Sequence, residues 1–266
     1  MSDPTYDDVT VRRHGDRGLV AELVLDRPAA HNALSTAMAR DIAAATAALA
    51  ADDSLRAVVV TSASEKAFCV GADLKERNAF SDADLMAQRP YFRAAFGGIL
   101  DLPVPTIAAV HGFALGGGLE LALSCDLIVA DETAVLGLPE VTVGVIPGGG
   151  GTQLLTRRIG SSRAADLVFT GRRLDVAEAE RLGLVDRRVA AGADAATALE
   201  LAATIAANSP VGVRNAKRAL RQGADVDLAT GLDVEDGAWR ATAFSGDRVE
   251  GVAAFNEKRS PDWPGR

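Results

Sequence analysis

Cysteine is scarce in this sequence: Cys69 and Cys125 are the only two among 266 residues. Their separation fits neither a redox pair nor a set of metal ligands, so we expect a reducing compartment and no disulfide. Long apolar runs are also missing, because Gly, Asp or Pro interrupts them before they reach the roughly 20 residues of a membrane span. The first ten residues, MSDPTYDDVT, are acidic and polar, unlike a signal peptide. We therefore expect a cytoplasmic protein with no membrane segment.

Positive charge is also in short supply. The chain has 28 Lys and Arg against 36 Asp and Glu, a formal net charge of −8, so we expect no nucleic-acid partner. Aromatic residues make up 5% of the chain, whereas apolar residues of all kinds make up 48% and charged residues 24%. This composition is typical of a folded protein with a sizeable core rather than of a disordered chain.

Several familiar catalytic patterns are absent. There is no G-x-S-x-G nucleophile elbow and no cluster of His, Asp and Glu with metal-ligand spacing, so we expect no metal. The glycine run 148–151 is followed by Thr152 and Gln153 instead of the Lys-Ser/Thr of a phosphate-binding loop. Of the three histidines, only His111 lies near the glycine-rich segment described next, and we interpret it as structural.

The most informative stretch is residues 109–151, which combines two glycine clusters with two glutamates in apolar surroundings. A short apolar strand is predicted at 106–110, then three glycines at 116–118 and a helix at 119–124. Glycines at a helix start leave N–H groups open to a ligand carbonyl. Burial would raise the pKa of Glu120 and of Glu140 into the range useful for proton transfer. The pattern fits addition or elimination beside a thioester carbonyl, although a solvated Glu120 and glycines that merely allow close packing would give the same spacing.

Strands and helices alternate up to about residue 189, which predicts an α/β fold. Strands are expected at 9–13, 19–26, 57–61 and 67–73, and helices from Ser35 to about 51 and over 81–100, the latter disrupted at Pro90 and at Gly97 and Gly98. On pattern alone, a doubly wound sheet is favoured. Beyond 189 only helices are expected, at 194–208, 210–221, 225–243 and 247–258, with Pro210 in a first turn. We therefore divide the chain into a core, 1–192, and a helical C-terminal module, 193–266.

Three segments in order, AFCVGADLKE, HGFALGGGLELALSCDLIVA and GLPEVTVGVIPGGGGTQ, resemble the crotonase superfamily and specifically its enoyl-CoA hydratases. The resemblance runs from about residue 19 to the C-terminus. The tail from GADVDLATGLDVEDG onward is similar to the branch that contains methylglutaconyl-CoA hydratases. The family implies a spiral of ββα units instead of a doubly wound sheet. It also implies a helical module that packs between subunits of a homotrimer, two of which stack into a homohexamer.

The resemblance assigns roles to four residues. The backbone N–H groups of Ala72 and Gly117 would form an oxyanion hole for the thioester oxygen. Glu120, ionised, would take a proton from water as it adds at C3, and Glu140, protonated, would supply the proton to C2. No cofactor is implied, because coenzyme A is part of the acyl-CoA substrate.

Further residues are expected to bind the substrate. Adenine would lie near residues 70–72, with the loop 27–31 alongside, and the pocket floor would come partly from 78–96. Alternatives stay open: Arg27 could be a solvated strand-end cation, Phe255 could be a packing residue, and Asp73 is expected to cap the following turn. The complete set is Arg27, Ala29, His31, Val70, Gly71, Asp73, Leu74, Gly116, Pro139, Gly148, Phe255 and Lys258.

The function predicted first is reversible syn hydration of a trans-2-enoyl-CoA, since both glutamates are present. Methylglutaconyl-CoA hydration and double-bond isomerisation are the alternatives within the superfamily. RNA binding, known for a related mitochondrial branch, would require a basic helix. The corresponding segment, STAMARDIAAATAALAADDS, has one Arg and no Lys, so we do not expect this protein to bind RNA.

Overall fold

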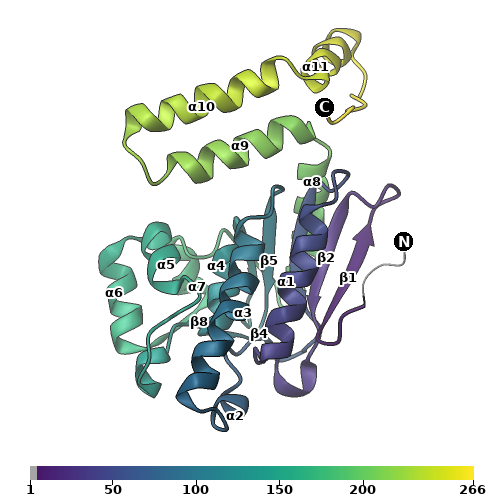
Figure 1. Ribbon diagram of the computed structural model, residues 1–266. Helices are drawn as coiled ribbons and strands as arrows, with labels where there is room; N and C mark the ends of the chain where they lie inside the picture. Colours follow the sequence, from purple (N-terminus) through teal and green to yellow (C-terminus); the bar gives the residue numbers. More distant parts are fainter. Residues whose placement is uncertain (1–4) are drawn as a thin grey trace.

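The computed structural model describes residues 5–266 and builds the protein around two sheets (Figure 1). The larger sheet has six strands in the order β1-β2-β3-β5-β7-β10, and the smaller has four in the order β4-β6-β8-β9. The strands of the larger sheet are β1 (Val9–His14), β2 (Val20–Leu25), β3 (Ala57–Ser62), β5 (Thr106–Val110), β7 (Leu127–Asp131) and β10 (Arg187–Val189). Those of the smaller are β4 (Ala67–Cys69), β6 (Phe113–Leu115), β8 (Val135–Gly137) and β9 (Arg173–Asp175).

Successive strand pairs divide themselves between the two sheets. In β3–β4, β5–β6 and β7–β8, the first strand joins the larger sheet and the second joins the smaller, with parallel pairing from one unit to the next. Helices follow each pair: α2 (Leu74–Arg77) and α3 (Asp82–Leu100), then α4 (Gly117–Ser124), then η2 (Glu140–Val143) and α5 (Gly151–Ile159). This is the expected spiral of ββα units. The single doubly wound sheet that the pattern alone favours is wrong, because a linear pattern does not show which strands share a sheet.

The larger sheet is covered on both faces. On one face Val58 and Val60 join the main core with α1 (Thr36–Ala50) and α3, while on the other Ala57 and Val59 pack against α8 (Asp194–Ala206). This alternation is the period of two expected of a strand buried on both sides. Small residues at every fourth position of α8 let it lie close to the sheet; they are Ala198, Ala202 and Ala206.

Helix α3 runs without interruption through Pro90, so the predicted disruption there and at Gly97 and Gly98 is wrong. Pro90 and Met86 are both exposed, so water can reach the Met86 carbonyl that loses its helical partner. Gly98 serves packing, because a Cβ added there would lie 2.2 Å from the Thr46 hydroxyl oxygen of α1. The remaining predicted helices and strands are found within a few residues of their expected ends.

Beyond α8, the chain leaves the core as three helices, α9 (Pro210–Gly223), α10 (Leu228–Ala243) and α11 (Gly246–Glu257), and Figure 1 shows α9 and α10 as a hairpin standing above the sheet. The division at residue 193 stays a prediction, although α8, assigned by it to the C-terminal module, packs on the sheet. The other helices are η1 (Pro28–Ala30), α6 (Ser161–Thr170) and α7 (Val176–Leu182). Of residues 5–266, no helix has the length and apolar character needed to cross a membrane.

Candidate functional site

Two glycine turns bring the N–H groups of Ala72 and Gly117 together. Gly71 before the first has φ = 90° and Gly116 before the second has φ = 54°, both in the region that favours glycine. A Cβ added to Gly71 would lie 3.2 Å from the Gly117 nitrogen, so the turns are in contact. Across the described chain, neither N–H donates a hydrogen bond to another residue. Two adjacent donors are therefore available to one acceptor.

Glu120 is buried one turn into α4, with only 3% of its surface exposed. Its Oε1 atom accepts hydrogen bonds from the backbone N–H groups of Gly149, at 2.6 Å, and Gly151, at 2.8 Å. Burial raises the pKa of Glu120, while these N–H donors and the nearby Arg89 guanidinium act in the opposite direction. The glycine run before α5 thus fixes this carboxyl and supports its ionised form.

Glu140, the first residue of η2, lies in a different environment. Its Oε2 atom is buried and, within residues 5–266, has no hydrogen-bond partner. Burial raises the pKa of Glu140 to about 7, and the charge of Glu120 contributes in the same direction. Gly116 lies against this carboxyl, since a Cβ added there would be 3.2 Å from Oε1. Of the two acids, Glu140 is therefore the one more readily held protonated near neutral pH.

One cavity of about 660 Å³ collects these groups. Ala72, Gly117, Glu120, Glu140 and Gly148 all line it, so the structure brings together the predicted catalytic and oxyanion residues. Apolar side chains form much of the remaining wall; they are Leu85, Met86, Phe92, Phe96, Val145 and Ile146. A chain of a few carbons attached to a carbonyl fits such a space chemically.

The predicted coenzyme A segments also lie side by side. The Val70 N–H donates to the His31 carbonyl at 3.3 Å, and the Leu34 N–H donates to the Gly71 carbonyl at 2.8 Å. Ala29, in η1, and His31 are exposed, as is Leu74 at the start of α2. The loop 27–31 therefore borders the turn 70–72, as expected, while its role in binding stays a prediction.

Asp73 caps α2, as its sequence position predicts. Its Oδ1 atom accepts the N–H groups of Lys75 at 3.0 Å and Glu76 at 3.1 Å. Its Oδ2 atom pairs with Arg27 Nη1 at 2.7 Å. Arg27 is thus tied to the cap, and its contact with a phosphate stays a prediction.

Three predicted binding residues lie apart from the central group. Pro139 precedes η2 and positions the Glu140 backbone. Phe255, 84% exposed, lies on α11, and Lys258 ends that helix. In the described part of the chain, none of the three lines the cavity. The roles of Phe255 and Lys258 at a neighbouring subunit stay a prediction.

Sequence reasoning missed two cations that line the cavity, Arg77 at the end of α2 and Arg89 on α3. Gln88, which is buried, accepts a hydrogen bond from Arg77 Nε at 2.9 Å. The spacing of Leu85, Arg89, Phe92 and Phe96 is that of one helix face, which is the signal that could have found them.

His111 has a structural environment. Its Nδ1 atom lies 2.9 Å from Asp194 Oδ2, and its Nε2 atom lies 2.7 Å from the Ser64 carbonyl oxygen. The ring therefore connects β5 to the start of α8, which agrees with the structural interpretation. Across the described residues, no group of three or more His, Cys, Asp or Glu is arranged to hold a metal ion. That no metal or cofactor is needed stays a prediction.

Comparison with known proteins agrees with this arrangement. The sequence model of the family described as enoyl-CoA hydratase/isomerase matches residues 16–266. Over 251 residues the chain is 44% identical to the mitochondrial enoyl-CoA hydratase domain-containing protein 2 of Mus musculus, covering 93% of this chain and 85% of the relative. Over 267 residues it is 43% identical to the mitochondrial methylglutaconyl-CoA hydratase of Homo sapiens, covering 98% of this chain and 78% of the relative. A crystal structure of an enoyl-CoA hydratase from Bacillus anthracis matches with a TM-score of 0.94 at 41% identity, covering 98% of this chain and 100% of that one.

Proposed function

Because the chain belongs to the enoyl-CoA hydratase/isomerase family, we propose that it is an enoyl-CoA hydratase, a lyase that adds water across the C2=C3 bond of a trans-2-enoyl-CoA. The observation that carries the proposal is the meeting in one cavity of the buried Glu120, the half-buried Glu140 and two N–H groups that have no partner within residues 5–266. Each pair of groups has a chemical task in this reaction and no evident task in packing alone.

The N–H groups of Ala72 and Gly117 receive the thioester oxygen. As water adds at C3, negative charge moves to this oxygen, and the two fixed donors stabilise the enolate. The loss of one such donor costs roughly 3–4 kcal/mol of transition-state stabilisation. The free donors come without reorganisation, because Gly71 and Gly116 already hold their turns in place.

The two glutamates act on the same face of the double bond. Glu120, ionised, accepts a proton from water as the oxygen bonds to C3, and Glu140, protonated, delivers its proton to C2. The overall change is syn addition of one water, and the roles exchange in the dehydration direction. The different environments of the carboxyls support this order, since Glu120 accepts two N–H bonds and the pKa of Glu140 is raised to about 7.

The substrate's coenzyme A lies, in this proposal, along the loop 27–31 and the turn 70–72. Arg27 supplies a phosphate contact while it is paired with Asp73. No separate cofactor takes part.

We infer further that the protein is a homotrimer or homohexamer in the cytoplasm. A groove of about 770 Å³ lies along α9 and α10 and is lined by large apolar side chains that include Leu220, Leu228, Leu232 and Trp239. These four are between 53% and 79% exposed in the single chain. A neighbouring copy that covers this surface would remove it from water.

The test follows the loss of conjugated thioester absorbance with crotonyl-CoA. We expect turnover by the wild type and a rate about 10²–10⁴-fold lower in Glu120→Gln, the range for loss of a general base. Glu132→Gln is the matched control. The Glu132 carboxylate does not line the cavity and is paired with Arg188, 3.1 Å from its Nη2 atom, so its replacement should leave activity unchanged. Equal activity in all three proteins would contradict the proposal.

Isomerisation is separated from hydration by the product. Hydration in water labelled with ¹⁸O places the heavy oxygen on C3, whereas double-bond migration adds none. Methylglutaconyl-CoA hydration is the second candidate, favoured by the arginines of the cavity. It is addressed by the substrate comparison below.

A further inference from the structure

About half of the arginines in residues 5–266 pair with a carboxylate, and the two arginines that line the cavity are among those that do not. Arg27, Arg172 and Arg221 each pair with an acid, at 2.7, 3.1 and 2.8 Å. In residues 5–266, Arg77 and Arg89 form no such ion pair, although both line the cavity. Arg77 is half-buried and Arg89 is exposed, and cations that line a binding cavity without a carboxylate partner are suited to an anionic ligand.

Arg77 is held in position by neutral contacts. Its Nε atom donates to Gln88, whose own amide donates to Thr36 Oγ1 at 2.8 Å and to Glu76 Oε2 at 3.0 Å. Its guanidinium carbon lies 4.9 Å from the centre of the Phe92 ring. This network fixes the direction of the guanidinium without an ion pair between Arg77 and a carboxylate of the described residues.

Arg89 lies next to the reacting groups. A Cβ added to Gly148 would be 2.7 Å from Arg89 Nη1, so the guanidinium packs directly over that glycine. Gly149, the next residue, donates to Glu120. The charge of Arg89 influences both Arg77 and Glu120, which places the three within electrostatic reach. Arg89 thus lies beside the glycine run that holds Glu120.

The rest of this wall is apolar, with Leu85, Met86, Phe92 and Ile146 among its side chains. A short hydrocarbon segment followed by an anionic end would match both its parts. A planar carboxylate also fits the fork of N–H donors on a guanidinium.

Resting on the hydratase function proposed above, we propose that the preferred substrate is an enoyl-CoA whose acyl chain ends in a carboxylate, which Arg89 binds directly with Arg77 as the second cation. The two arginines are then specificity-determining residues that act on the distal end of the acyl chain. Glu120 and Glu140 act at its double bond.

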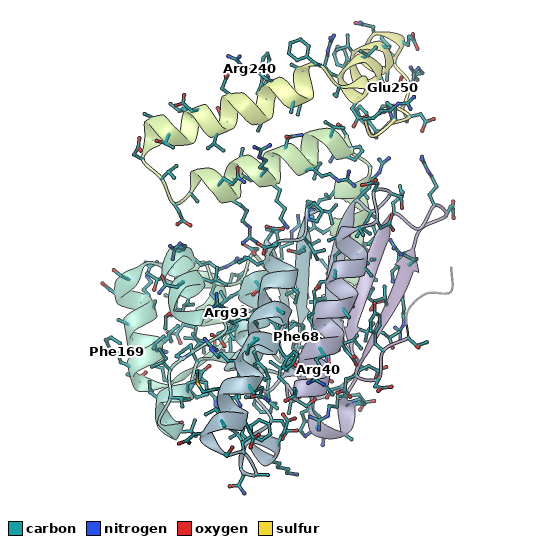
Figure 2. The ribbon with its side chains drawn as sticks, viewed as in Figure 1. Arg40, Phe68, Arg93, Phe169, Arg240 and Glu250 are labelled. Atoms are coloured by element: carbon teal, nitrogen blue, oxygen red, sulfur yellow. The ribbon has the colours of Figure 1, made fainter. Side chains whose placement is uncertain are left out.

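The experiment compares kcat/KM for trans-glutaconyl-CoA, which ends in a carboxylate, and trans-2-pentenoyl-CoA, a neutral chain of equal length. We expect the wild type to prefer the carboxylated substrate. In Arg89→Gln, kcat/KM for glutaconyl-CoA should fall about 10- to 100-fold, as for the loss of a charge-assisted hydrogen bond, and that for pentenoyl-CoA less than about twofold. Arg93→Gln is the matched control, because Arg93, labelled in Figure 2, lies one turn further along α3 and does not line the cavity in the described chain.

Two other roles for Arg89 predict different results. If Arg89 binds a phosphate of coenzyme A, Arg89→Gln lowers kcat/KM equally for both substrates, since both carry that phosphate. If Arg89 only keeps Glu120 ionised, Arg89→Gln lowers kcat/KM equally for both substrates. The acidic limb of the pH–rate profile then also moves to higher pH. Either result overturns the proposal.

A binding arm separates this inference from the hydratase function. Calorimetric affinities of glutaryl-CoA and valeryl-CoA, both saturated, do not depend on catalysis. A preference for glutaryl-CoA that disappears in Arg89→Gln supports the carboxylate site even if neither enoyl-CoA is hydrated. Equal affinities in the wild type, together with normal hydration of pentenoyl-CoA, overturn the site and leave the hydratase function standing.

Discussion

Glu120 and Glu140 are the same residue type in the same cavity, and their surroundings make them different acids. Glu120 accepts two backbone N–H groups, which support its ionised form, while a buried oxygen of Glu140 has no partner among the described residues. Such a division allows one group to take a proton while the other gives one.

Replacing Glu140 tests this division. In Glu140→Gln we expect kcat for crotonyl-CoA to fall about 10²–10⁴-fold, because the side chain can no longer donate a proton. The free energy of unfolding should be little changed, since Oε2 of Glu140 has no hydrogen bond within the described residues for the substitution to break. Stopped-flow rates and urea unfolding measure the two effects, and near-normal turnover in this variant would falsify the assignment.

The pH dependence follows from the same residue. The pKa of Glu140 is raised to about 7. The protonated form needed for hydration is therefore the main one below that pH, and its population falls as pH rises through it. We expect kcat/KM for hydration to decline above pH 7, approaching about tenfold per pH unit. Initial rates from pH 5.5 to 9 at constant ionic strength measure this, and a flat profile up to pH 9 would contradict it.

Gly116 connects the backbone to this carboxyl. Its φ of 54° and ψ of −126° exclude other residues, and a Cβ there would press on Glu140 Oε1 at 3.2 Å. We expect Gly116→Ala to lose both stability and most of its activity. Gly183→Ala is the matched control: its φ is 80° and a Cβ would meet nothing within 4 Å, so it should cost roughly 1–2 kcal/mol of stability and no activity. Equal activity in the two variants would contradict this role of Gly116.

At the scale of elements, the glycine cluster that opens α4 serves two purposes. Gly118 serves packing, since a Cβ there would lie 2.0 Å from the Cys69 carbonyl oxygen of β4. Gly116 and Gly117 face the cavity residues. The packing interpretation and the catalytic interpretation are therefore compatible, because each describes different glycines.

Another element-scale feature is the pairing of His111 with Asp194, which attaches α8 to the end of β5. The hydrogen bond from Asp194 raises the pKa of His111 from 6.5 to about 8. The folded state therefore favours the protonated ring. The stabilisation of the fold by this ring is complete below pH 6.5 and is lost as pH rises through about 8.

We expect the free energy of unfolding to fall by about 2 kcal/mol from this group between pH 6 and pH 9. In His111→Gln that part of the pH dependence should disappear. Urea unfolding of both proteins at the two pH values measures the difference. The same decrease in the variant would show that other groups cause it.

At the scale of the whole molecule, one surface stands out. The α9–α10 hairpin gathers large, exposed apolar side chains along one groove, whereas Figure 2 shows Arg240 on the side of α10 away from α9. Lys217 and Arg221 hold α9 to the core through Asp126, at 2.8 Å each. A rigidly attached, exposed apolar hairpin is suited to an interface between copies.

We expect light scattering to give the mass of a trimer or hexamer for the wild type and a smaller mass for Leu220→Asp. That variant puts a charge on a side chain that is 76% exposed in the single chain and lines the groove. Arg240→Ala, which removes only an exposed pair with Asp236, should keep the wild-type mass. A wild type that is monomeric at micromolar concentration would contradict the prediction.

Much of the site was accessible from sequence because its signals are local. Three short motifs carry Ala72, Gly117, Glu120 and Glu140, and the structure confirms that these residues line one cavity. The same motifs say nothing of Arg77 and Arg89, whose common position depends on how α2 and α3 fold back over the glycine run before α5.

The sequence by itself determined the first five strands, the helices of the C-terminal part, the end of the strand pattern at 189 and the capping role of Asp73, because periodicity, caps and turns act over a few residues. Only the tertiary structure decided that the strands divide between two sheets, that α8 covers the larger one, and that Oε2 of Glu140 has no partner within residues 5–266 where Oε1 of Glu120 has two. Those properties depend on contacts between residues far apart in the chain, and burial, which sets the protonation of a carboxyl, is a property of the packed molecule.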